Sequence, residues 1–519
     1  MRPLQGLKAS IIAQDEAAQI RDMDELANAQ LGVYDIDGRK AKVEELYAKG
    51  ADPYSPCSLP ERVTIASMYA RFDPTTWEPG IALHQHPRTI AGRLTAKRLQ
   101  GKVAFLDVQD ITGQIQVLFR EDFCGVELFR YMEHDFDVGD IMEVIGYPYT
   151  TPRGQLSLQA EEARLLTKSL RPPPDRRSGL VDTGSRYRYR ELDMLASDTT
   201  RELFITRAKI VNEIRQWLNA RSFVEIETPA LQSLAGGAGS RPFTTHHNAL
   251  DMELNLRISV ELYLNRAIVG GFENVYDMGK VFRNEGISPK HSPEFTILEF
   301  MMAYADYNDC ATATEEMLRD VAQAVHGHTI IHRNGEKIDL GERWHRVTLR
   351  ELMHGWTGLD FMESTRDQVA ELLDEPYDPA LTWAQAIQAV YSKLVEPNVN
   401  QPTFVYDFPL EGFPITKRHR SFPELGEHCD AVIGGIELCS IDTELNDPID
   451  QWHRFVDQRH RRDDDTDMPH PNDSEYTRAI EYGYHPTAGG GMGIDRVVMI
   501  LTGAATLRDV IPFPIVKDW

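Results

Sequence analysis

The chain has 519 residues, of which 42% are hydrophobic and 26% are charged, as is ordinary for a soluble globular protein. A chain of this length forms roughly two to four domains. The formal net charge of −25 argues against nucleic-acid binding driven by global charge, although local basic patches can still contact RNA phosphates. Acidic residues stand where a signal peptide needs an apolar run, and "VVMIL" at 497–501 is too short to cross a bilayer. We therefore expect a cytoplasmic protein with no membrane partner.

Three changes of composition divide the first 195 residues. Residues 1–85 mix charged, helix-like stretches with proline-bearing loops, which indicates an N-terminal helical extension. Over 86–170, about five short alternating or β-branched runs are separated by glycine turns, and this pattern is typical of a small all-β barrel of the oligonucleotide-binding type (OB fold). The proline-rich stretch "RPPPDRRSG" then predicts a linker over 171–195.

The remainder, 196–519, predicts an α+β domain. The stretch "ELFITRAKIVNEIRQWLNA" has apolar residues at helical spacing. The alternating strand "FVEIE" follows, and Pro229 comes two residues after its end. Strand-like and helix-like pieces then alternate to the end of the chain.

The stretch "VFRNEGISPKHSPEFTILEF" at 281–300 concentrates charges around one aromatic ring. Strand alternation on both sides of its loop predicts a long antiparallel hairpin over 273–304. Side chains repeat every two residues along a strand, so one face of the second arm can hold a stacking ring and a carboxylate about 13 Å apart. That face carries Phe295, Ile297, Glu299 and Met301. Arg283, with Lys290 and His291 from the loop, can clamp phosphates; the alternative is a surface hairpin with scattered charges.

Two further segments point to the same chemistry. "TAGGGMGIDRVVMILTG" at 487–503 is a glycine-rich turn that enters an apolar helix with Arg496 in its first turn, and a helix N-terminus favours anions. "CDAVIGGIELCSIDTELNDP" at 429–448 carries several carboxylates around a strand and a turn. Carboxylates near phosphate-binding arginines are what nucleotide-bound Mg²⁺ needs.

Together, "FVEIETP", "FRNEG…PEFT…E" and "GGGMGIDR" resemble the three motifs of class II aminoacyl-tRNA synthetases. The stretches "ELYLNRAIVGGFENVYDMGKVFRNEGIS", "TELND" and "GRLTAKRLQGKVAFLDVQD" are similar to lysyl-tRNA synthetases in particular, and the resemblance covers roughly 38–515. It implies an antiparallel-sheet catalytic domain over 196–519, preceded by an OB-fold anticodon-binding domain over 86–170.

The resemblance also implies roles for single residues. Arg283 and Arg496 are the implied catalytic residues, the first holding the ATP α-phosphate and the amino-acid carboxylate, the second holding the γ-phosphate. The implied ATP-binding set is Arg283, Glu285, His291, Phe295, Glu437 and Arg496, in which Phe295 stacks on adenine. Asp430 and Glu437 match two magnesium ligands, and Pro229 matches a proline at a homodimer interface. The implied anticodon contacts are Arg98, Phe105 and Gln116.

The amino-acid pocket departs from the family pattern. Its implied residues are Glu261, Glu299, Met301, Ser440, Asp442 and Glu444, with Glu261 receiving the α-amino group. Met301 stands where the family has tyrosine, and Ser440 and Asp442 replace asparagine and phenylalanine. "FPI" (Phe413–Ile415) and "PKHS" (Pro289–Ser292) replace "SPL" and "VRHN", and in the barrel Gln155 replaces glutamate. The carboxylates still suit a cation, because a neutral ligand would leave them unpaired.

These residues predict ATP-dependent activation of lysine to lysyl-adenylate and its transfer to the 3′ end of a lysine tRNA, with Mg²⁺ as cofactor. Two alternatives stay open. The chain is a paralogue that uses another basic amino acid, such as β-lysine, or another acceptor, because hydrogen bonds decide between near relatives. Or it is a non-catalytic RNA-binding or regulatory homologue, which the presence of both arginines disfavours. An aspartyl or asparaginyl enzyme shares the fold, but an aspartyl pocket would need fixed cations to bind the acidic side chain of its substrate.

Overall fold

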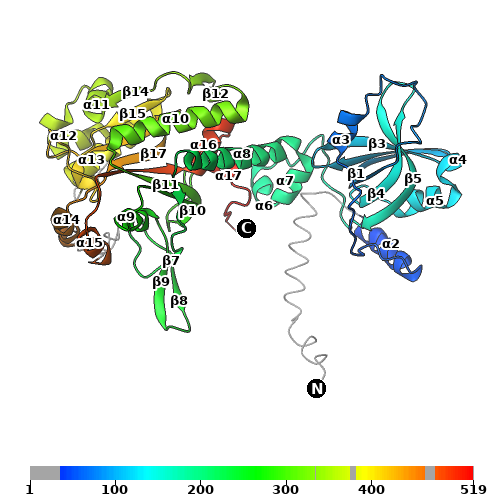
Figure 1. The fold of residues 1–519 in the computed structure, drawn as a ribbon, viewed down its shortest axis with the longest axis horizontal. Coiled ribbons are helices and arrows are strands. Elements are labelled where there is room, and N and C mark those ends of the chain that lie inside the picture. Colours follow the sequence, from blue (N-terminus) through cyan, green and yellow to red (C-terminus); the bar gives the residue numbers. More distant parts are fainter. Residues whose placement is uncertain (1–34, 334, 374–380, 462–473, 518–519) are drawn as a thin grey trace, which may run out of the picture. The chain divides into compact units, whose positions relative to one another are not determined.

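The computed structural model describes residues 35–333, 335–373, 381–461 and 474–517 (Figure 1). The chain divides into two compact units, Met1–Leu180 and Val181–Trp519, and each is described by itself. Part of the expected N-terminal extension, 1–34, lies outside the described residues. In the part of the chain that the structure describes, no helix has the length and apolar character needed to span a membrane.

The first unit is a closed five-stranded barrel, which confirms the OB-fold prediction. Its strands close in the order β1-β2-β3-β5-β4. Their bounds are β1 Arg88–Gln100, β2 Val103–Asp110, β3 Gly113–Arg120, β4 Ile141–Thr150 and β5 Leu156–Thr167, with α4 (Glu121–Cys124) and α5 (Val126–Asp135) between β3 and β4. Alternate residues such as Ala104, Leu106 and Val108 are fully buried, because every second side chain of a barrel strand points inward.

Two helices precede the barrel, α2 (Ile36–Ala48) and α3 (Ile65–Arg71). Leu46, Ile65 and Met68 from these helices are buried in the same apolar cluster as the inward residues of the strands. The described part of the predicted extension therefore belongs to the core of the barrel unit.

The second unit begins with three helices, α6 (Thr183–Arg188), α7 (Arg190–Ala196) and α8 (Asp198–Ala220). The first two occupy much of the segment that the sequence suggested as a linker. Arg190 is 1% exposed, and its Nε donates to the Pro512 carbonyl at 2.9 Å while Nη1 lies 3.2 Å from Asp193. The contact with Pro512 attaches α7 to the C-terminal segment of the same unit. The predicted limits of the domains and of the linker stay predictions.

The second unit is built on an eight-stranded sheet of order β14-β15-β16-β17-β18-β11-β10-β6. Among the described strand pairs of this sheet, only the two outermost, β14 with β15 and β10 with β6, are parallel. The bounds are β6 Val224–Glu225, β10 Asn274–Phe282, β11 Glu294–Ala303, β14 His345–Thr348, β15 Thr403–Tyr406, β16 His428–Ile433, β17 Ile436–Thr443 and β18 Thr487–Gly493. This mixed α/β domain with a mainly antiparallel sheet confirms the predicted fold class.

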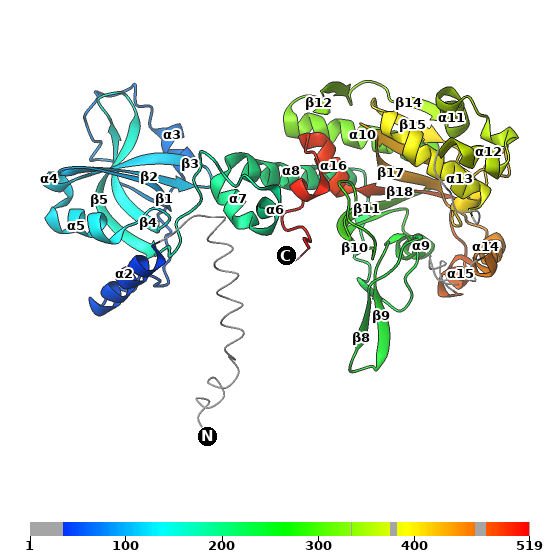
Figure 2. The same ribbon diagram turned by 180° about the vertical axis from the view of Figure 1, so that it is seen from behind.

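Three helices, α8, α10 (Tyr307–His326) and α16 (Ile494–Thr502), run along one face of this sheet (Figures 1 and 2). Their apolar residues form one large cluster with sheet residues such as Phe300, Cys439 and Met492. Because this face is filled by helices, the opposite face is left for a site. The long hairpin β10–β11 pairs from Asn274 with Met302 to Phe282 with Glu294, as the alternation in the sequence predicts.

The other elements surround the open face and the ends of the sheet. The helices are α9 Glu261–Val269, α11 Leu349–Thr357, α12 Arg366–Ala370, α13 Trp383–Val390, α14 Pro448–Arg461, α15 Ser474–Ile480 and α17 Leu507–Val510. The strands are β7 Leu231–Gln232, β8 Thr244–His247, β9 Met252–Leu256, β12 Ile330–Arg333 and β13 Glu336–Asp339. Short helical turns cover 361–363, 371–373, 391–395, 396–398 and 410–412.

Candidate active site

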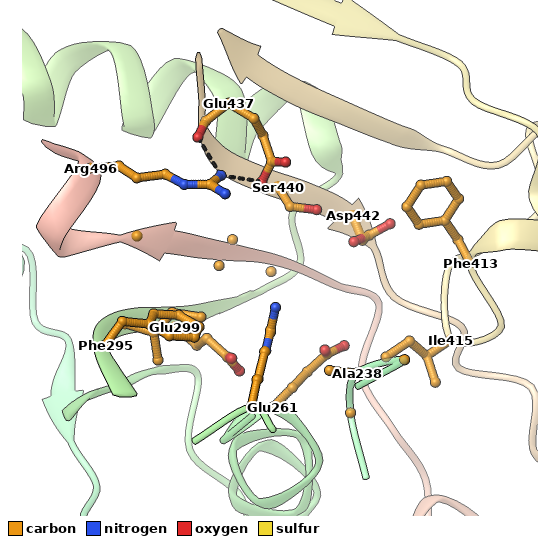
Figure 3. Close-up of a pocket in the computed structure, with 18 of the residues that line it drawn as sticks. Ala238, Glu261, Phe295, Glu299, Phe413, Ile415, Glu437, Ser440, Asp442 and Arg496 are labelled. Atoms are coloured by element: carbon orange, nitrogen blue, oxygen red, sulfur yellow. Dashed lines mark hydrogen bonds and ion pairs between the residues drawn. The ribbon is translucent and has the colours of Figure 1, made fainter. Parts of the chain in front are cut away.

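A cavity of about 480 Å³ lies on the open face of the sheet, over β11, β18 and β17. Its floor has two cross-strand rows, Glu299–Gly491–Ser440 and Met301–Gly489–Asp442. The middle member of each row is a glycine, so β18 contributes backbone but no side chain to the floor. The result is a trough between β11 and β17, with carboxyl groups on both walls (Figure 3).

Cationic and aromatic side chains gather at one end of the trough. Arg283 follows the end of β10, and its Cζ lies 5.2 Å from the centroid of the Phe295 ring on β11. Arg496, in the first turn of α16, donates from Nη1 to the Glu437 carbonyl at 2.7 Å and lies 3.6 Å from the Glu437 carboxylate (Figure 3). Desolvation lowers the pKa of Arg283, and Glu299 leads the acids that oppose this shift. This end therefore presents two guanidinium groups and one ring.

The loop between β10 and β11 closes this end. A bridge between Ser288 and His291 makes a tight turn, and His291 lines the cavity together with Glu285. Burial and the charge of Arg496 lower the pKa of His291, so the imidazole is neutral at pH 7. Lys290 lies 3.4 Å from Glu396, an acid before β15 that sequence reasoning did not identify.

Two predicted metal ligands lie beside this cationic end. Glu437 lines the cavity, whereas Asp430 on β16 is 7% exposed and is not among the lining residues. Burial and the neighbouring Glu437 raise the pKa of Asp430 to about 6. Among the residues that the structure describes there is no group of three or more metal-ligating side chains. The two acids nevertheless fit Mg²⁺, because their mutual repulsion is relieved by a cation and both supply the oxygen donors it prefers.

Carboxylates dominate the other end of the trough. Glu299 is 4% exposed, and its two carboxylate oxygens share the hydrogen bond that the Ser259 hydroxyl donates, at 3.0 and 3.1 Å. Glu444 is 2% exposed and accepts from Asn265 Nδ2 at 3.1 Å. Burial, then Glu444 and Glu299, raise the pKa of Glu261 on α9 well above its usual value. Glu299 also raises the pKa of Glu444, so these buried acids form a strongly cation-seeking pocket. Ser259 and Asn265 support the pocket without any signal in the sequence.

The fourth acid of this end, Asp442, belongs to a network that sequence reasoning missed. His428, on β16, is 1% exposed and lies between Asp442 (Nδ1 to Oδ1, 2.8 Å) and Asp430 (Nε2 to Oδ1, 3.1 Å). The Phe413 ring stacks on His428, with ring centroids 3.7 Å apart. Burial alone would lower the pKa of His428, but Asp442 and Asp430 outweigh it and raise this pKa to about 10.

The shifted pKa of Glu299 predicts how stability depends on pH. Burial raises this pKa from 4.5 to about 7, against the opposing effects of Ser259 and Arg283. The folded state therefore binds the proton more tightly than the unfolded state, and its stability falls as the pH rises between these two values, by about 3 kcal/mol in all. We expect Glu299→Gln to remove this fall in urea unfolding at pH 5 and pH 8.

The control is Glu294→Gln, because Glu294 is on the same strand but on its opposite face, where it lies 3.5 Å from Lys280. The control should keep the pH dependence of the wild type. An unchanged pH dependence in Glu299→Gln would contradict the assignment.

In the barrel, the structure brings the three expected anticodon residues onto one outer face. Arg98 pairs across strands with Phe105, and Gln116 pairs with Asp107, two residues beyond Phe105. Phe105 is half-buried and points away from the core that Ala104 and Leu106 fill. Asp107, which the sequence did not single out, holds Arg98 through two hydrogen bonds of 2.9 and 3.0 Å. Arg98 is thus already paired with an acid.

The proline of the first motif, Pro229, is exposed just after β6. The residue before it, Thr228, donates to Asp277 at 2.7 Å, and Arg257 Nη1 lies 3.0 Å from the same carboxylate. These buried contacts fix the backbone that presents Pro229. Its place at a homodimer interface stays a prediction.

Comparisons with known proteins agree with this geometry. Residues 182–517 match the family model for class II tRNA synthetases (D, K and N), and residues 89–166 match the model for the OB-fold nucleic acid binding domain. A lysine–tRNA ligase of Halalkalibacterium halodurans is 40% identical over 93% of this chain and 97% of its own length. Lysine–tRNA ligases of Carboxydothermus hydrogenoformans (44% identical, 82% of this chain and 88% of the relative) and Staphylococcus haemolyticus (40%, 96% and 100%) are similar. The chain therefore belongs to the class II tRNA synthetases and, among them, to the lysine–tRNA ligase family.

Proposed function

We propose that this protein activates lysine with ATP and transfers the lysyl group to the 3′ end of tRNA. One observation carries the proposal: a single trough holds two guanidinium groups and a stacking ring at one end and buried carboxylates at the other. The first end suits a nucleoside triphosphate, and the second suits an amino acid with a side-chain ammonium. Family membership supports the same substrates.

The chemistry follows from charge and position. In the first step, an oxygen of the amino-acid carboxylate attacks the α-phosphorus, a new oxygen–phosphorus bond forms, and pyrophosphate leaves with the electrons of the broken bond. Arg283 screens the repulsion between carboxylate and α-phosphate, and Arg496 holds the γ-phosphate. No protein nucleophile is required, because positioning and charge neutralisation lower the barrier. In the second step, a terminal hydroxyl of tRNA attacks the adenylate carbonyl, and AMP leaves.

Asp430 and Glu437 are the residues that would hold Mg²⁺, and the raised pKa of Asp430, to which the Glu437 charge contributes, supports a cation site there. When bound, the ion would neutralise charge on the triphosphate. Around it, Glu396 keeps Lys290 near the same end, and the neutral His291 with Glu285 covers the nucleotide. Phe295 stacks on the adenine ring.

Recognition of the amino acid falls to the carboxylate end. Glu261, at the start of α9, receives the α-ammonium, and Glu299 and Glu444 receive the ammonium of the side chain. In the barrel, Arg98, Phe105 and Gln116 contact the anticodon, with Phe105 stacking on a base at about 1–3 kcal/mol. A homodimer formed around Pro229 and a cytoplasmic location complete the proposal as predictions.

The test is ATP–pyrophosphate exchange with lysine, ornithine, arginine, β-lysine and aspartate, each supplied alone with Mg²⁺. We expect strong exchange with lysine and none with aspartate, because the pocket offers carboxylates to the side chain. Exchange with a different basic amino acid in place of lysine would favour the paralogue. The sequence argument for a paralogue is that Met301, Ser440 and Asp442 depart from the pattern of the family it resembles. Absence of exchange with every amino acid would overturn the enzyme assignment.

A further inference from the structure

The carboxyl group of Asp442 is fixed in place and open to the trough. Its Oδ1 accepts hydrogen bonds from the Thr416 hydroxyl and from His428 Nδ1. Both contacts use the same oxygen, and the described residues give Oδ2 no partner. The side chain is 18% exposed, and this exposure is to the cavity that it lines. Asp442 is therefore a preorganised acceptor with one oxygen available to a ligand.

Glu444, two residues further along the chain, also has one oxygen available. Its Oε2 accepts from Asn265, while Oε1 lies over Gly489: a Cβ placed on that glycine would be 2.7 Å from Oε1 and would overlap the Met301 sulfur. Gly489 is also the direct cross-strand partner of Asp442. Oε1 of Glu444, the Met301 thioether and the Asp442 carboxyl thus meet around one glycine.

Asp442 and Glu444 lie on the same side of the trough. Burial, then the charge of Asp442, raise the pKa of Glu444 well above its usual value. Neighbouring carboxylates in a desolvated pocket repel one another, and a cation between them removes the repulsion. His428 is buried and is not among the residues that line the cavity, so it leaves the trough side of Asp442 open to a ligand.

The row Met301–Gly489–Asp442 carries a charge on one side only. Met301 on β11 is an apolar thioether and Asp442 on β17 is a carboxylate, and the two lie on opposite sides of the same glycine. The charged acceptor that this row offers to a side-chain ammonium is therefore on the β17 wall.

We infer that Asp442 is a specificity-determining residue that binds the side-chain ammonium of the substrate together with Glu444, and that His428 is a positioning residue that holds Asp442. The substrate class is an α-amino acid whose side chain ends in an ammonium that reaches β17. The inference rests on the proposed function. It adds that the β17 wall of the trough binds the side-chain ammonium of the substrate.

The first test compares variants of position 442 by lysine-dependent ATP–pyrophosphate exchange. Asp442→Asn keeps the shape and removes the charge. We expect it to raise the KM for lysine about 10- to 100-fold, the effect of losing a charged hydrogen bond, and to change the KM for ATP and kcat less than threefold. Asp442→Phe should have a similar effect, and the double variant Asp442→Phe, Met301→Tyr should recover most of the affinity for lysine, because it places a hydroxyl acceptor on the opposite side of Gly489.

The second test separates the two ring nitrogens of His428. The amide nitrogen of asparagine takes the place of Nδ1, so His428→Asn keeps a hydrogen-bond donor for Asp442. The amide nitrogen of glutamine takes the place of Nε2, so His428→Gln keeps a donor for Asp430 and loses the one for Asp442. We expect His428→Gln to raise the KM for lysine at least tenfold and His428→Asn less than threefold. Equal effects would mean that the histidine is merely structural.

The control is Asp339→Asn, because the Asp339 carboxylate accepts from Thr329 on the β12–β13 hairpin, outside the trough. It should match the wild type. A KM for lysine within twofold of the wild type in Asp442→Asn, or no recovery in the double variant, would overturn the inference while leaving the proposed function intact. Absence of exchange in the wild type would instead overturn the proposed function.

Discussion

Replacing Arg283 with alanine is expected to lower the rate of lysine-dependent ATP–pyrophosphate exchange at least 1000-fold, or about 4 kcal/mol of transition-state free energy. Arg283 lies at the cationic end of the trough, with its guanidinium near the Phe295 ring, and the charges of Glu299, Glu285 and Glu437 oppose the desolvation that lowers its pKa. Two anions, the lysine carboxylate and the α-phosphate, must approach each other here. Without the guanidinium, their repulsion is unscreened in a partly desolvated site.

Arg283→Lys separates charge from geometry. An ammonium keeps the charge but lacks the planar pair of donors that binds carboxylate and phosphate together, so we expect activity between that of the wild type and that of the alanine variant. Arg350→Ala is the control, since Arg350 pairs with Asp360 outside the trough. Exchange by Arg283→Ala within tenfold of the wild type would contradict the catalytic role.

Glu261→Gln is expected to change binding and stability in opposite directions. The KM for lysine should rise at least 100-fold, because Glu261 is the proposed partner of the α-ammonium and a neutral amide loses the charged hydrogen bond. The unliganded protein should become more stable at pH 8, because the variant removes a desolvated acid whose pKa is raised by burial and by the charges of Glu444 and Glu299. Exchange kinetics measure the first effect, and urea unfolding at pH 8 without ligand measures the second.

The matched control is again Glu294→Gln, at the start of β11 and on the face opposite the trough. It should leave both the KM for lysine and the stability within experimental error of the wild type. A Glu261→Gln variant with lower stability would show that Glu261 is a structural partner in the empty pocket. One that kept the wild-type KM would remove it from the amino-acid site.

Local patterns predicted the parts of the site that lie on one strand or one motif. The alternation of β11 placed Phe295, Ile297, Glu299 and Met301 on one face, and the structure has all four in the cavity wall. Period-two alternation needs no long-range information, which is why it succeeds. The barrel was predictable for the same reason, from short runs separated by glycine turns.

The His428 network shows why the rest was not predictable. A two-residue turn at Gly434–Gly435 with regular pairing would place His428 opposite Ile441. The register shifts between Ala431 and Val432, so that His428 instead pairs with Asp442. A β-bulge of one residue moves every later side chain to a new partner. No feature of the single sequence fixes the position of that bulge.

Contacts between distant segments were missed for a related reason. Lys290 and Glu396, 106 residues apart, meet only because the hairpin loop and the chain before β15 close over the same end of the trough. Ser259 supports Glu299 across 40 residues, and Asn265 supports Glu444 across 179 residues. Such pairs depend on strand order in the sheet, and ordinary serine and asparagine side chains carry no signal of it.

The central claim, that the chain ligates lysine to tRNA, is tested most directly by charging. Purified protein would be incubated with ATP, Mg²⁺, labelled lysine and total tRNA, beside the same tRNA lacking its 3′-terminal adenosine. We predict ATP-dependent label on acid-precipitated intact tRNA, released by mild alkali as an ester would be, and no label on the truncated tRNA. Strong lysine-dependent pyrophosphate exchange without any label on tRNA would contradict the claim and assign the adenylate to another acceptor.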